Sequence, residues 1–393
     1  MTGLNVLIAV TAILVVLGIA ELALHRRRLA TIRYRIHVNG TRGKSSVTRL
    51  IAAGLRAGDI TTCAKTTGST ARMILPDGRE LPIYRPGGAN IIEQKRIVAV
   101  AAAYQAEALV IECMALQPLL QSLSELKLIQ ATHGVITNAR PDHLEVMGPG
   151  ERDVARALAG MTPVAGMLYT TETEQLGELK QAAEDRDSKL AVVEPLTDAE
   201  VLSRFRYTEH GDNVALALKV CADLGVDREV ALEGMVNARP DPGAMTERRV
   251  DFFGRQITFV NGFAANDPVS TKQGWELASS RHSDLERRIA VFNCRADRPE
   301  RSVLLGREFA TWPSADHVVL MGTATHLFAH AATGAGLDPA KLVIAEELPV
   351  EQVFERIVAL VDDSALVMGM GNIGEGGLRL ANYFRNRALP ERS

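Results

Sequence analysis

The sequence predicts an α/β protein with an N-terminal transmembrane helix, a central parallel-sheet domain of the phosphate-loop type and a smaller C-terminal α/β domain. The chain has 393 residues, which exceeds the size of a single compact core. An apolar run precedes a strand, a glycine-rich loop and a helix, and strand-like runs then alternate with helical stretches. We expect an anchor and linker at residues 1–33, the central domain at 34–240 and the C-terminal domain at 250–393, with a hinge near 241–243.

The first element is an apolar run over residues 4–24, in which Glu21 is the only charged residue. As a helix it would be roughly 30 Å long, which matches the hydrocarbon core of a bilayer. The basic segment 25–28 follows at once, so the positive-inside rule places the N-terminus outside and the rest of the chain in the cytoplasm. A cleaved signal peptide or a buried core helix are the alternatives, but the run lacks a basic start and is uniformly apolar.

The central domain is predicted to open with a strand, a phosphate-binding loop and a helix. Residues 34–39 alternate loosely and predict a strand, which enters the loop G-T-R-G-K-S at 40–45. Residues 45–57 have one apolar face and predict a helix, with Gly58 where a glycine cap is expected. A chance turn before a helix is the alternative, but the strand, loop and helix together favour phosphate binding.

Each part of this loop has a role in binding ATP and Mg²⁺. Glycines let the backbone approach the phosphates, and the amide N–H groups converge on them. Lys44 supplies a positive charge to the β- and γ-phosphates, and the Ser45 hydroxyl can ligate Mg²⁺. The residues expected to contact the nucleotide are Gly40, Thr41, Arg42, Gly43, Lys44, Ser45 and Ser46.

Two later apolar runs each deliver polar residues at their ends. Residues 106–112 end on Glu112, and residues 133–138 lead into Asp142 and His143. The carboxyl ends of parallel strands face the ligand crevice of an open α/β sheet, so Glu112 is a natural Mg²⁺ ligand. His143 could bind a second metal ion or orient a carboxylate. A surface glutamate and a structural histidine are the alternatives.

The loop 84–90 carries a cation among glycines, which suits an acidic substrate or a plain connector equally. We take Arg85 and Asn90 as its candidate substrate contacts. The formal net charge of the chain is −3, which offers no basic field for nucleic acid. The four cysteines are far apart in the sequence and form no metal-like pair, which fits a reduced, cytosolic setting for the soluble part.

The order of these motifs resembles the Mur ligase superfamily, whose members join an amino acid to a carboxylate using ATP. The resemblance rests on the loop 40–45, the strand ending in Glu112, T-N-A-R-P-D-H-L at 137–144, H-G-D-N at 210–213 and N-G-F-A-A-N-D-P at 261–268. Within the superfamily the chain is most similar to the poly-γ-glutamate synthases of capsule systems.

The resemblance implies a mechanism and further site residues. A carboxylate of the growing chain would take the γ-phosphate of ATP, and the amine of glutamate would then attack the acyl phosphate. The implied catalytic residues are Lys44, Glu112 and His143. The implied metal ligands are Ser45, Thr67, Glu112 and His143. The further nucleotide contacts that it implies are Asn213, Asn266, Arg295 and Asp297.

The chain also departs from the superfamily pattern. Many members carry a carbamylated lysine shortly after the metal histidine, but no lysine lies between His143 and Lys180. The P-G-R-x-E pattern at the domain junction is replaced by P-G-A-M-T-E at 242–247, and Asn261 stands where an aspartate is usual. A second metal site would therefore be built differently here or be weaker.

Three functional classes remain open at this stage. The leading one is an ATP-dependent amide ligase that polymerises glutamate into poly-γ-glutamate at the cytoplasmic face of the membrane. A folylpolyglutamate-type or peptidoglycan-type ligase, and a membrane-bound phosphate-loop ATPase that powers or regulates transport, are the alternatives. The resemblance also implies small membrane-embedded and accessory subunits of a synthase complex as partners, with a homo-oligomer as an open alternative.

Overall fold

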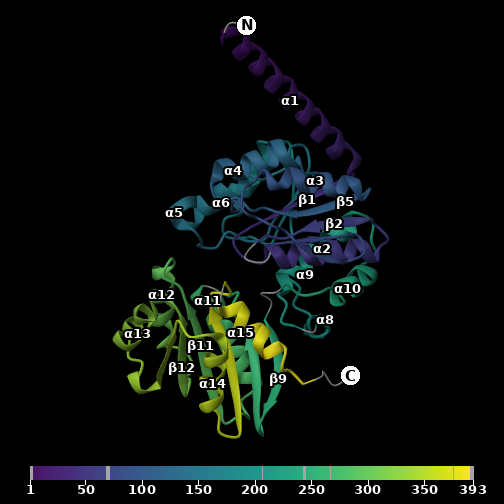
Figure 1. Ribbon diagram of the computed structural model, residues 1–393. Coiled ribbons are helices and arrows are strands. Elements are labelled where there is room, and N and C mark those ends of the chain that lie inside the picture. Colours follow the sequence, from purple (N-terminus) through teal and green to yellow (C-terminus); the bar gives the residue numbers. More distant parts are fainter. Residues whose placement is uncertain are drawn as a thin grey trace. The chain divides into compact units, whose positions relative to one another are not determined.

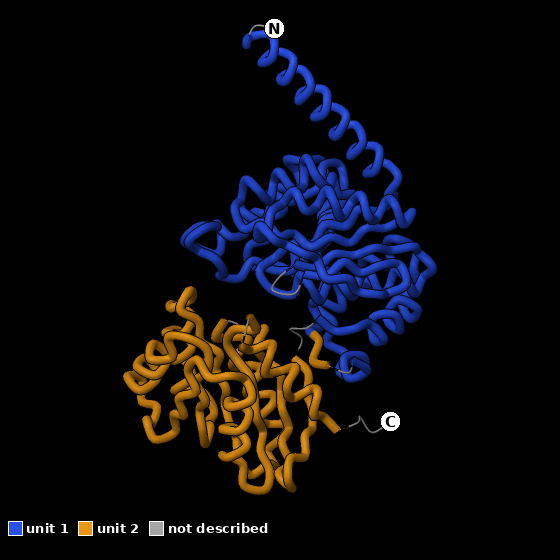
Figure 2. Tube along the Cα trace, in the orientation of Figure 1, with its two compact units in different colours: residues 1–205, 210–241 blue, residues 206–209, 242–393 orange. Residues whose placement is uncertain are grey.

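The computed structural model describes residues 3–67, 71–205, 207–241, 245–265, 267–374 and 376–389. The chain divides into two compact units (Figure 2). The first unit comprises Met1–Phe205 with His210–Asp241, and the second comprises Arg206–Glu209 with Pro242–Ser393. Each unit is built on its own sheet with helices around it (Figure 1), which confirms the predicted α/β fold class.

The N-terminal helix α1 runs without interruption from Gly3 to Thr31 (Figure 1). It is long and apolar enough to cross a membrane, and none of its most apolar 18-residue window is buried in the protein. Its last turns differ, because His25 and Leu29 are buried against the first unit. Nε2 of His25 lies 2.8 Å from the carbonyl oxygen of Leu128, and Glu21 forms an ion pair with Lys95. The helix therefore extends beyond the apolar run and becomes part of the folded unit.

The first unit contains an eight-stranded sheet in the order β4-β3-β2-β5-β1-β6-β7-β8. Its strands are β1 Tyr34–Asn39, β2 Thr62–Lys65, β3 Arg72–Ile74, β4 Glu80–Pro82, β5 Ala108–Glu112, β6 His133–Ile136, β7 Met167–Thr170 and β8 Lys189–Val192. The pairings of β3 with β2 and β4 are antiparallel, and the other pairings are parallel. β1 coincides with the strand predicted at 34–39 and occupies the middle of the sheet, where Ile36 and Val38 are fully buried.

Helices connect these strands and place the phosphate loop at the sheet edge. The helical elements are α2 Lys44–Ala57, α3 Glu93–Ala103, α4 Pro118–Leu123, the π-helical turn η1 Ser124–Ile129, α5 Leu144–Met147, α6 Glu151–Ala159, α7 Leu176–Glu184, α8 Ala199–Ser203, α9 Gly211–Asp223 and α10 Arg228–Val236. The chain leaves β1 toward β2 on one side, and it leaves β6 toward β7 on the other. The carboxyl ends of β1 and β6 thus form a topological switch point, where open α/β sheets bind ligands.

The helix α2 begins one residue earlier than predicted, at Lys44, and ends at Ala57 as expected. Gly58 occupies the predicted cap position, but its φ of −86° needs no glycine. Space is the reason for glycine there, because a Cβ at Gly58 would lie 2.6 Å from the methyl groups of Val226. The left-handed residue is Asp59 instead, with φ of 61°.

The second unit contains a six-stranded sheet in the order β13-β12-β11-β14-β10-β9, in which only β9 and β10 pair antiparallel. The strands are β9 Thr246–Phe252, β10 Arg255–Asn261, β11 Arg287–Cys294, β12 His317–Gly322, β13 Leu342–Glu346 and β14 Ser364–Gly371. The helical elements are α11 Pro268–Arg281, α12 Pro299–Phe309, α13 Thr325–Gly334, the short 3₁₀ turn η2 Pro339–Lys341, α14 Val350–Ala359 and α15 Gly376–Arg385. The strand-like runs predicted at 316–321 and 365–370 correspond to β12 and β14.

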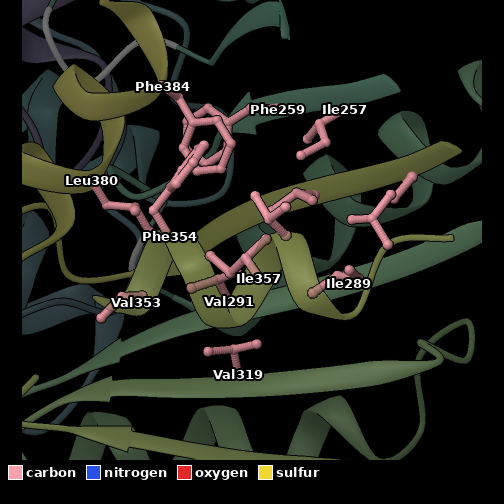
Figure 3. Close-up of a cluster of buried hydrophobic side chains, with 14 of the residues drawn as sticks. Ile257, Phe259, Ile289, Val291, Val319, Val353, Phe354, Ile357, Leu380 and Phe384 are labelled. Carbon is pink, nitrogen blue, oxygen red and sulfur yellow. The ribbon is translucent and has the colours of Figure 1, made fainter. Parts of the chain in front are cut away.

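One face of this second sheet is covered by an aromatic and aliphatic core (Figure 3). The rings of Phe259 on β10 and Phe384 on α15 stack with centroids 4.0 Å apart, and Phe354 on α14 meets Phe384 edge-on at 5.0 Å. Alternate residues of the strands, including Ile289 and Val291, point into the same cluster (Figure 3). This packing fixes α14 and α15 on the sheet and explains why the second unit is compact by itself.

Candidate nucleotide and metal site

The phosphate loop adopts a backbone that requires glycine at two positions. Gly40 has φ of 132° and Gly43 has φ of 79°. A Cβ at Gly40 would lie 2.0 Å from Oγ1 of Thr137, and a Cβ at Gly43 would lie 2.4 Å from Oδ1 of Asn213. Both side chains therefore close on the loop from neighbouring elements, and only glycine leaves room for them.

The residues after β6 hold the loop in place. Oγ1 of Thr41 donates to Oδ1 of Asn138 at 2.7 Å, and the same oxygen accepts the N–H of Arg42 at 3.2 Å. Oγ1 of Thr137 donates to the carbonyl oxygen of Arg42 at 2.5 Å. Thr137 and Asn138 were not among the expected site residues, although their position directly after an apolar run was the signal that could have identified them.

Lys44 is the first residue of α2, so its charge lies at the helix N-terminus, where backbone N–H groups favour anions. Its Nζ donates to the carbonyl oxygen of Gly40 at 2.6 Å and folds back over the loop. In this position Lys44 can move onto a phosphate by changing side-chain rotamers alone. Ser46 also lies in the first turn of α2 and is half-buried.

Glu112, the last residue of β5, accepts three hydrogen bonds, one from Ser45 of α2 and two from Thr67 in the loop after β2. Glu112 as a whole is only 2% exposed. Oγ of Ser45 donates to Oε2 at 2.8 Å, and the N–H of Thr67 donates to the same oxygen at 2.7 Å. The hydroxyl of Thr67 donates to Oε1. The structure thus brings together three of the four expected metal-ligating residues.

The Glu112 carboxylate and the hydroxyl groups of Ser45 and Thr67 supply only oxygen atoms, which Mg²⁺ prefers as ligands. Within the described ranges, no group of three or more His, Cys, Asp or Glu side chains is arranged to hold a metal ion. A cation at this site would therefore depend on one carboxylate and two hydroxyl groups, and nucleotide phosphates and water would complete its coordination. The residues fit Mg²⁺ in that form.

The fourth expected ligand, His143, lies in the loop before α5 with φ of 48°. Its Nδ1 is 3.2 Å from Oε1 of Glu145, and its Nε2 is 4.0 Å from Oδ1 of Asp142. Asp142 in turn pairs with Arg42 of the phosphate loop at 3.3 Å. The segment is therefore tied to the loop through Asp142, while the contacts found for His143 are with acids of its own segment.

The expected substrate residues have different environments. Arg85 binds Glu93 with both arms of its guanidinium, at 2.6 Å from Nε and 2.9 Å from Nη2. Glu93 raises the pKa of Arg85, and the charge of Glu112 contributes in the same direction, so Arg85 lies within the electrostatic reach of Glu112. Asn90 is exposed, and its Oδ1 accepts the N–H of Ile92 at 2.9 Å. This hydrogen bond gives Asn90 a role in the turn before α3.

The remaining expected nucleotide contacts fall in both units. Asn213 lies in the first turn of α9, buried, with its Oδ1 beside Gly43 of the loop. In the second unit, Arg295 follows β11 and binds Asp297 through two hydrogen bonds of 2.8 and 2.6 Å. Asn266 lies outside the described residues.

A phosphate loop beside the buried carboxylate of Glu112, followed by a second α/β unit, is the arrangement expected of a Mur-type ligase. A family model described as the Mur ligase middle domain matches residues 38–215, and one described as the poly-γ-glutamate synthase CapB C-terminal domain matches residues 247–387. The capsule biosynthesis protein CapB of Bacillus anthracis is 39% identical over 92% of this chain and 79% of its own length. The PGA synthase CapB of Bacillus subtilis strain 168 is 36% identical over 93% of this chain and 94% of its own. The chain belongs to the CapB family of the Mur ligase superfamily.

Solved structures of folate-modifying ligases share the fold over both units. Escherichia coli FolC in complex with ADP aligns with a TM-score of 0.69 at 16% identity and covers 94% of each chain. Mycobacterium tuberculosis folylpolyglutamate synthase, complexed with ADP and AMPPCP, gives a TM-score of 0.66 at 16% identity, covering 93% of this chain and 95% of its own. At this identity the likeness concerns the fold.

Proposed function

We propose that this protein is the ATP-dependent ligase of a poly-γ-glutamate synthase, joining glutamate units through γ-amide bonds and releasing ADP and phosphate. The observation that carries the proposal is the contact between Ser45 of the phosphate-loop helix and Glu112, because these two residues together could hold the metal ion of a bound nucleotide. Membership of the CapB family supports the choice of glutamate as substrate.

The reaction proceeds in two balanced steps. A carboxylate oxygen at the end of the growing chain attacks the γ-phosphorus of ATP, the bond to the β-phosphate oxygen breaks, and ADP leaves. The amine of the incoming glutamate, having lost a proton to base, then attacks the acyl carbon. The tetrahedral intermediate collapses and expels phosphate, which leaves an amide. Phosphate is a good leaving group, whereas the oxygen of a free carboxylate is a poor one. The carboxylate is therefore phosphorylated first, which consumes ATP.

The residues of the first unit have distinct roles in this scheme. The loop amides and the N-terminus of α2 bind the phosphates, and the Lys44 ammonium stabilises the negative charge on the transferring phosphoryl group. Ser45, Thr67 and Glu112 would hold Mg²⁺, which when bound neutralises phosphate charge. Arg85 is the candidate contact for the acidic acceptor, because its cation is fixed near Glu112.

Other assignments complete the proposal. His143 would orient the acceptor or hold a second cation, and Arg295 and Asp297 of the second unit are proposed as further nucleotide contacts. Asn213 would support the loop through Gly43, and Asn90 would shape the substrate loop. The proposed domain organisation keeps an anchor and linker at 1–33, a central domain at 34–240 and a C-terminal domain at 250–393. Residues 242 and 243 of the proposed hinge lie outside the described residues.

α1 is proposed to span the membrane once, with the N-terminus outside and both units in the cytoplasm, because the basic residues 25–28 follow the apolar run. A polymer made there must be exported, so small membrane-embedded and accessory subunits are proposed as partners. A pull-down from detergent extracts should recover membrane proteins with the chain.

One assay tests the function. Membranes containing the protein, supplied with ATP, Mg²⁺ and labelled glutamate, should yield a labelled polymer with ADP and phosphate in step with amide bonds. Formation of AMP would overturn the acyl-phosphate scheme. ATP hydrolysis that is indifferent to glutamate would favour the transport ATPase, and transfer of glutamate to a folate would favour a folylpolyglutamate-type ligase.

A further inference from the structure

Lys65 is the last residue of β2, and its side chain is fully buried. Its Nζ lies 3.0 Å from Oε1 of Glu93 and 3.6 Å from Sδ of Met114. Burial lowers the pKa of Lys65, and the charges of Glu93 and Glu112 act in the opposite direction. Packing does not explain a lysine here, because an apolar side chain would fill the same space without the desolvation of an ammonium group.

The register of the sheet explains why this lysine matters to the site. Lys65 pairs with Ile111 of β5, the residue before Glu112. Two residues after Lys65, Thr67 donates both its N–H and its hydroxyl to the Glu112 carboxylate. The ammonium group is therefore shielded from solvent and within electrostatic reach of the Glu112 carboxylate, where its charge is poorly screened.

Glu93 makes Lys65 part of a charge network. As the first residue of α3, Glu93 accepts both arms of Arg85 and also binds Lys65. The charge of Glu112 acts to raise the pKa of both Lys65 and Arg85, so both cations lie within its electrostatic reach. Lys65 and Arg85 thus balance Glu93 and Glu112, so this group of four charged side chains has no net charge. Lys44 adds a further positive charge at the neighbouring loop.

We propose that Lys65 is a positioning residue that offsets the charge of Glu112, so that a divalent cation is bound there only together with nucleotide phosphates. The inference rests on the proposed function, in which Glu112 is a metal ligand. Without nucleotide, a cation approaching Glu112 is repelled by Lys65 and Arg85. When nucleotide is bound, the negative charge of the triphosphate attracts the cation and outweighs the repulsion by Lys65 and Arg85. This order prevents free cations from occupying the carboxylate and blocking the hydroxyl of Ser45.

The test measures Mn²⁺ binding by electron paramagnetic resonance on the full-length protein in detergent, with no turnover. Without nucleotide, Lys65→Met should bind Mn²⁺ about tenfold more tightly than wild type, since one buried positive charge is removed. Glu93→Gln should bind about tenfold more weakly, since it removes a negative charge. The matched control is Lys219→Met, which removes a half-exposed lysine paired with Asp223 on α9 of the same unit and should leave Mn²⁺ binding unchanged.

Lys65→Arg separates charge from packing. It keeps the positive charge in a larger side chain, so Mn²⁺ binding without nucleotide should stay as weak as in wild type. Unchanged affinity in a folded Lys65→Met protein would overturn the inference, as would a shift of Lys65→Met and Glu93→Gln in the same direction. If Lys65→Met does not fold, Glu93→Gln decides alone: unchanged or tighter binding counts against the inference.

Failure of the proposed metal role gives a different result. With a non-hydrolysable ATP analogue, Glu112→Gln should weaken Mn²⁺ binding if Glu112 is a ligand. Retained binding in that variant would remove the metal role from the proposed function itself. Loss of binding in Glu112→Gln, combined with no effect of Lys65→Met, would leave the metal role standing and overturn only the role of Lys65.

Discussion

Oγ of Ser45 in α2 donates a hydrogen bond of 2.8 Å to Oε2 of Glu112 at the end of β5. The two residues are 67 positions apart in the chain. Their contact follows from the parallel pairing of β1 with β5, in which Val38 lies opposite Glu112. The last residues of β1 and β5 therefore reach the sheet edge together, and the helix that follows β1 begins beside the carboxylate.

Glu112→Gln should lower kcat by at least about a hundredfold while the fold persists. The amide keeps the size of the side chain and can still accept from Ser45, but it removes the anion that a divalent cation needs. The measurement is ADP release with glutamate present, together with a melting curve. Glu107→Gln, just before the same strand and exposed, is the control and should retain activity. Comparable activity in both variants would contradict the role of Glu112.

Gly43→Ala should abolish nucleotide binding. Gly43 has φ of 79°, and an added Cβ would lie 2.4 Å from Oδ1 of Asn213. Gly78 provides a matched control, because its φ is 80° and nothing lies within 4 Å of its Cβ position. Gly78→Ala should therefore show only the backbone strain, about 1 kcal/mol of unfolding free energy, and should bind a fluorescent ATP analogue normally. Equal binding by the two variants would show that the contact with Asn213 is unimportant.

The sequence predicted the local elements of this site well. The strand at 34–39 and the helix after the loop were apparent because glycine, lysine and hydrophobic spacing act over a few residues. Glu112 was also apparent, since its strand ends on it. The roles of Thr137, Lys65 and Glu93 were not apparent, because each depends on which strands are neighbours in the sheet. Strand order is a long-range property that local patterns do not encode.

Burial was equally hard to predict for charged side chains. Lys65, His37 and Glu125 are almost completely buried, and single-sequence patterns place such residues on the surface. The metal role of His143 stays a prediction: its position after a strand favoured a metal site, and the structure places acidic groups of Asp142 and Glu145 4.0 and 3.2 Å from its ring. Nearness to a strand end gives a location, but the partners of a side chain come from tertiary structure.

His37 predicts a pH dependence of stability. It lies fully buried on β1, with Nδ1 2.7 Å from Oε2 of Glu125. Burial acts to lower the pKa of His37, but its interactions with Cys113 and Glu125 outweigh burial and raise it from 6.5 to about 9. The protonated histidine therefore stabilises the fold fully below about pH 6.5, and this contribution is lost as the pH rises through about 9.

The measurement is the free energy of unfolding of wild type and His37→Gln from pH 6 to pH 9.5, by urea titration. The difference between them should shrink by on the order of 3 kcal/mol across this range. His133→Gln is the control, because burial lowers the pKa of His133 and its effect should appear on the acid side instead. A constant difference between wild type and His37→Gln at all pH values would contradict the prediction.

The last turns of α1 predict where the anchor can be cut. A chain that begins at residue 21 loses most of the apolar run but keeps His25, bound to the carbonyl of Leu128, and the buried Leu29. It should move from the membrane to the soluble fraction with nearly the wild-type melting temperature.

A chain that begins at residue 33 also loses Leu29 and the carbonyls of Leu29 and Ile32 that Arg35 binds. Its unfolding free energy should fall by roughly 2–4 kcal/mol, since a buried leucine and its surroundings are exposed. Equal melting temperatures of the two truncated chains would show that the last turns of α1 do not stabilise the first unit. Retention of the chain that begins at residue 21 in the membrane would show that α1 is not the anchor.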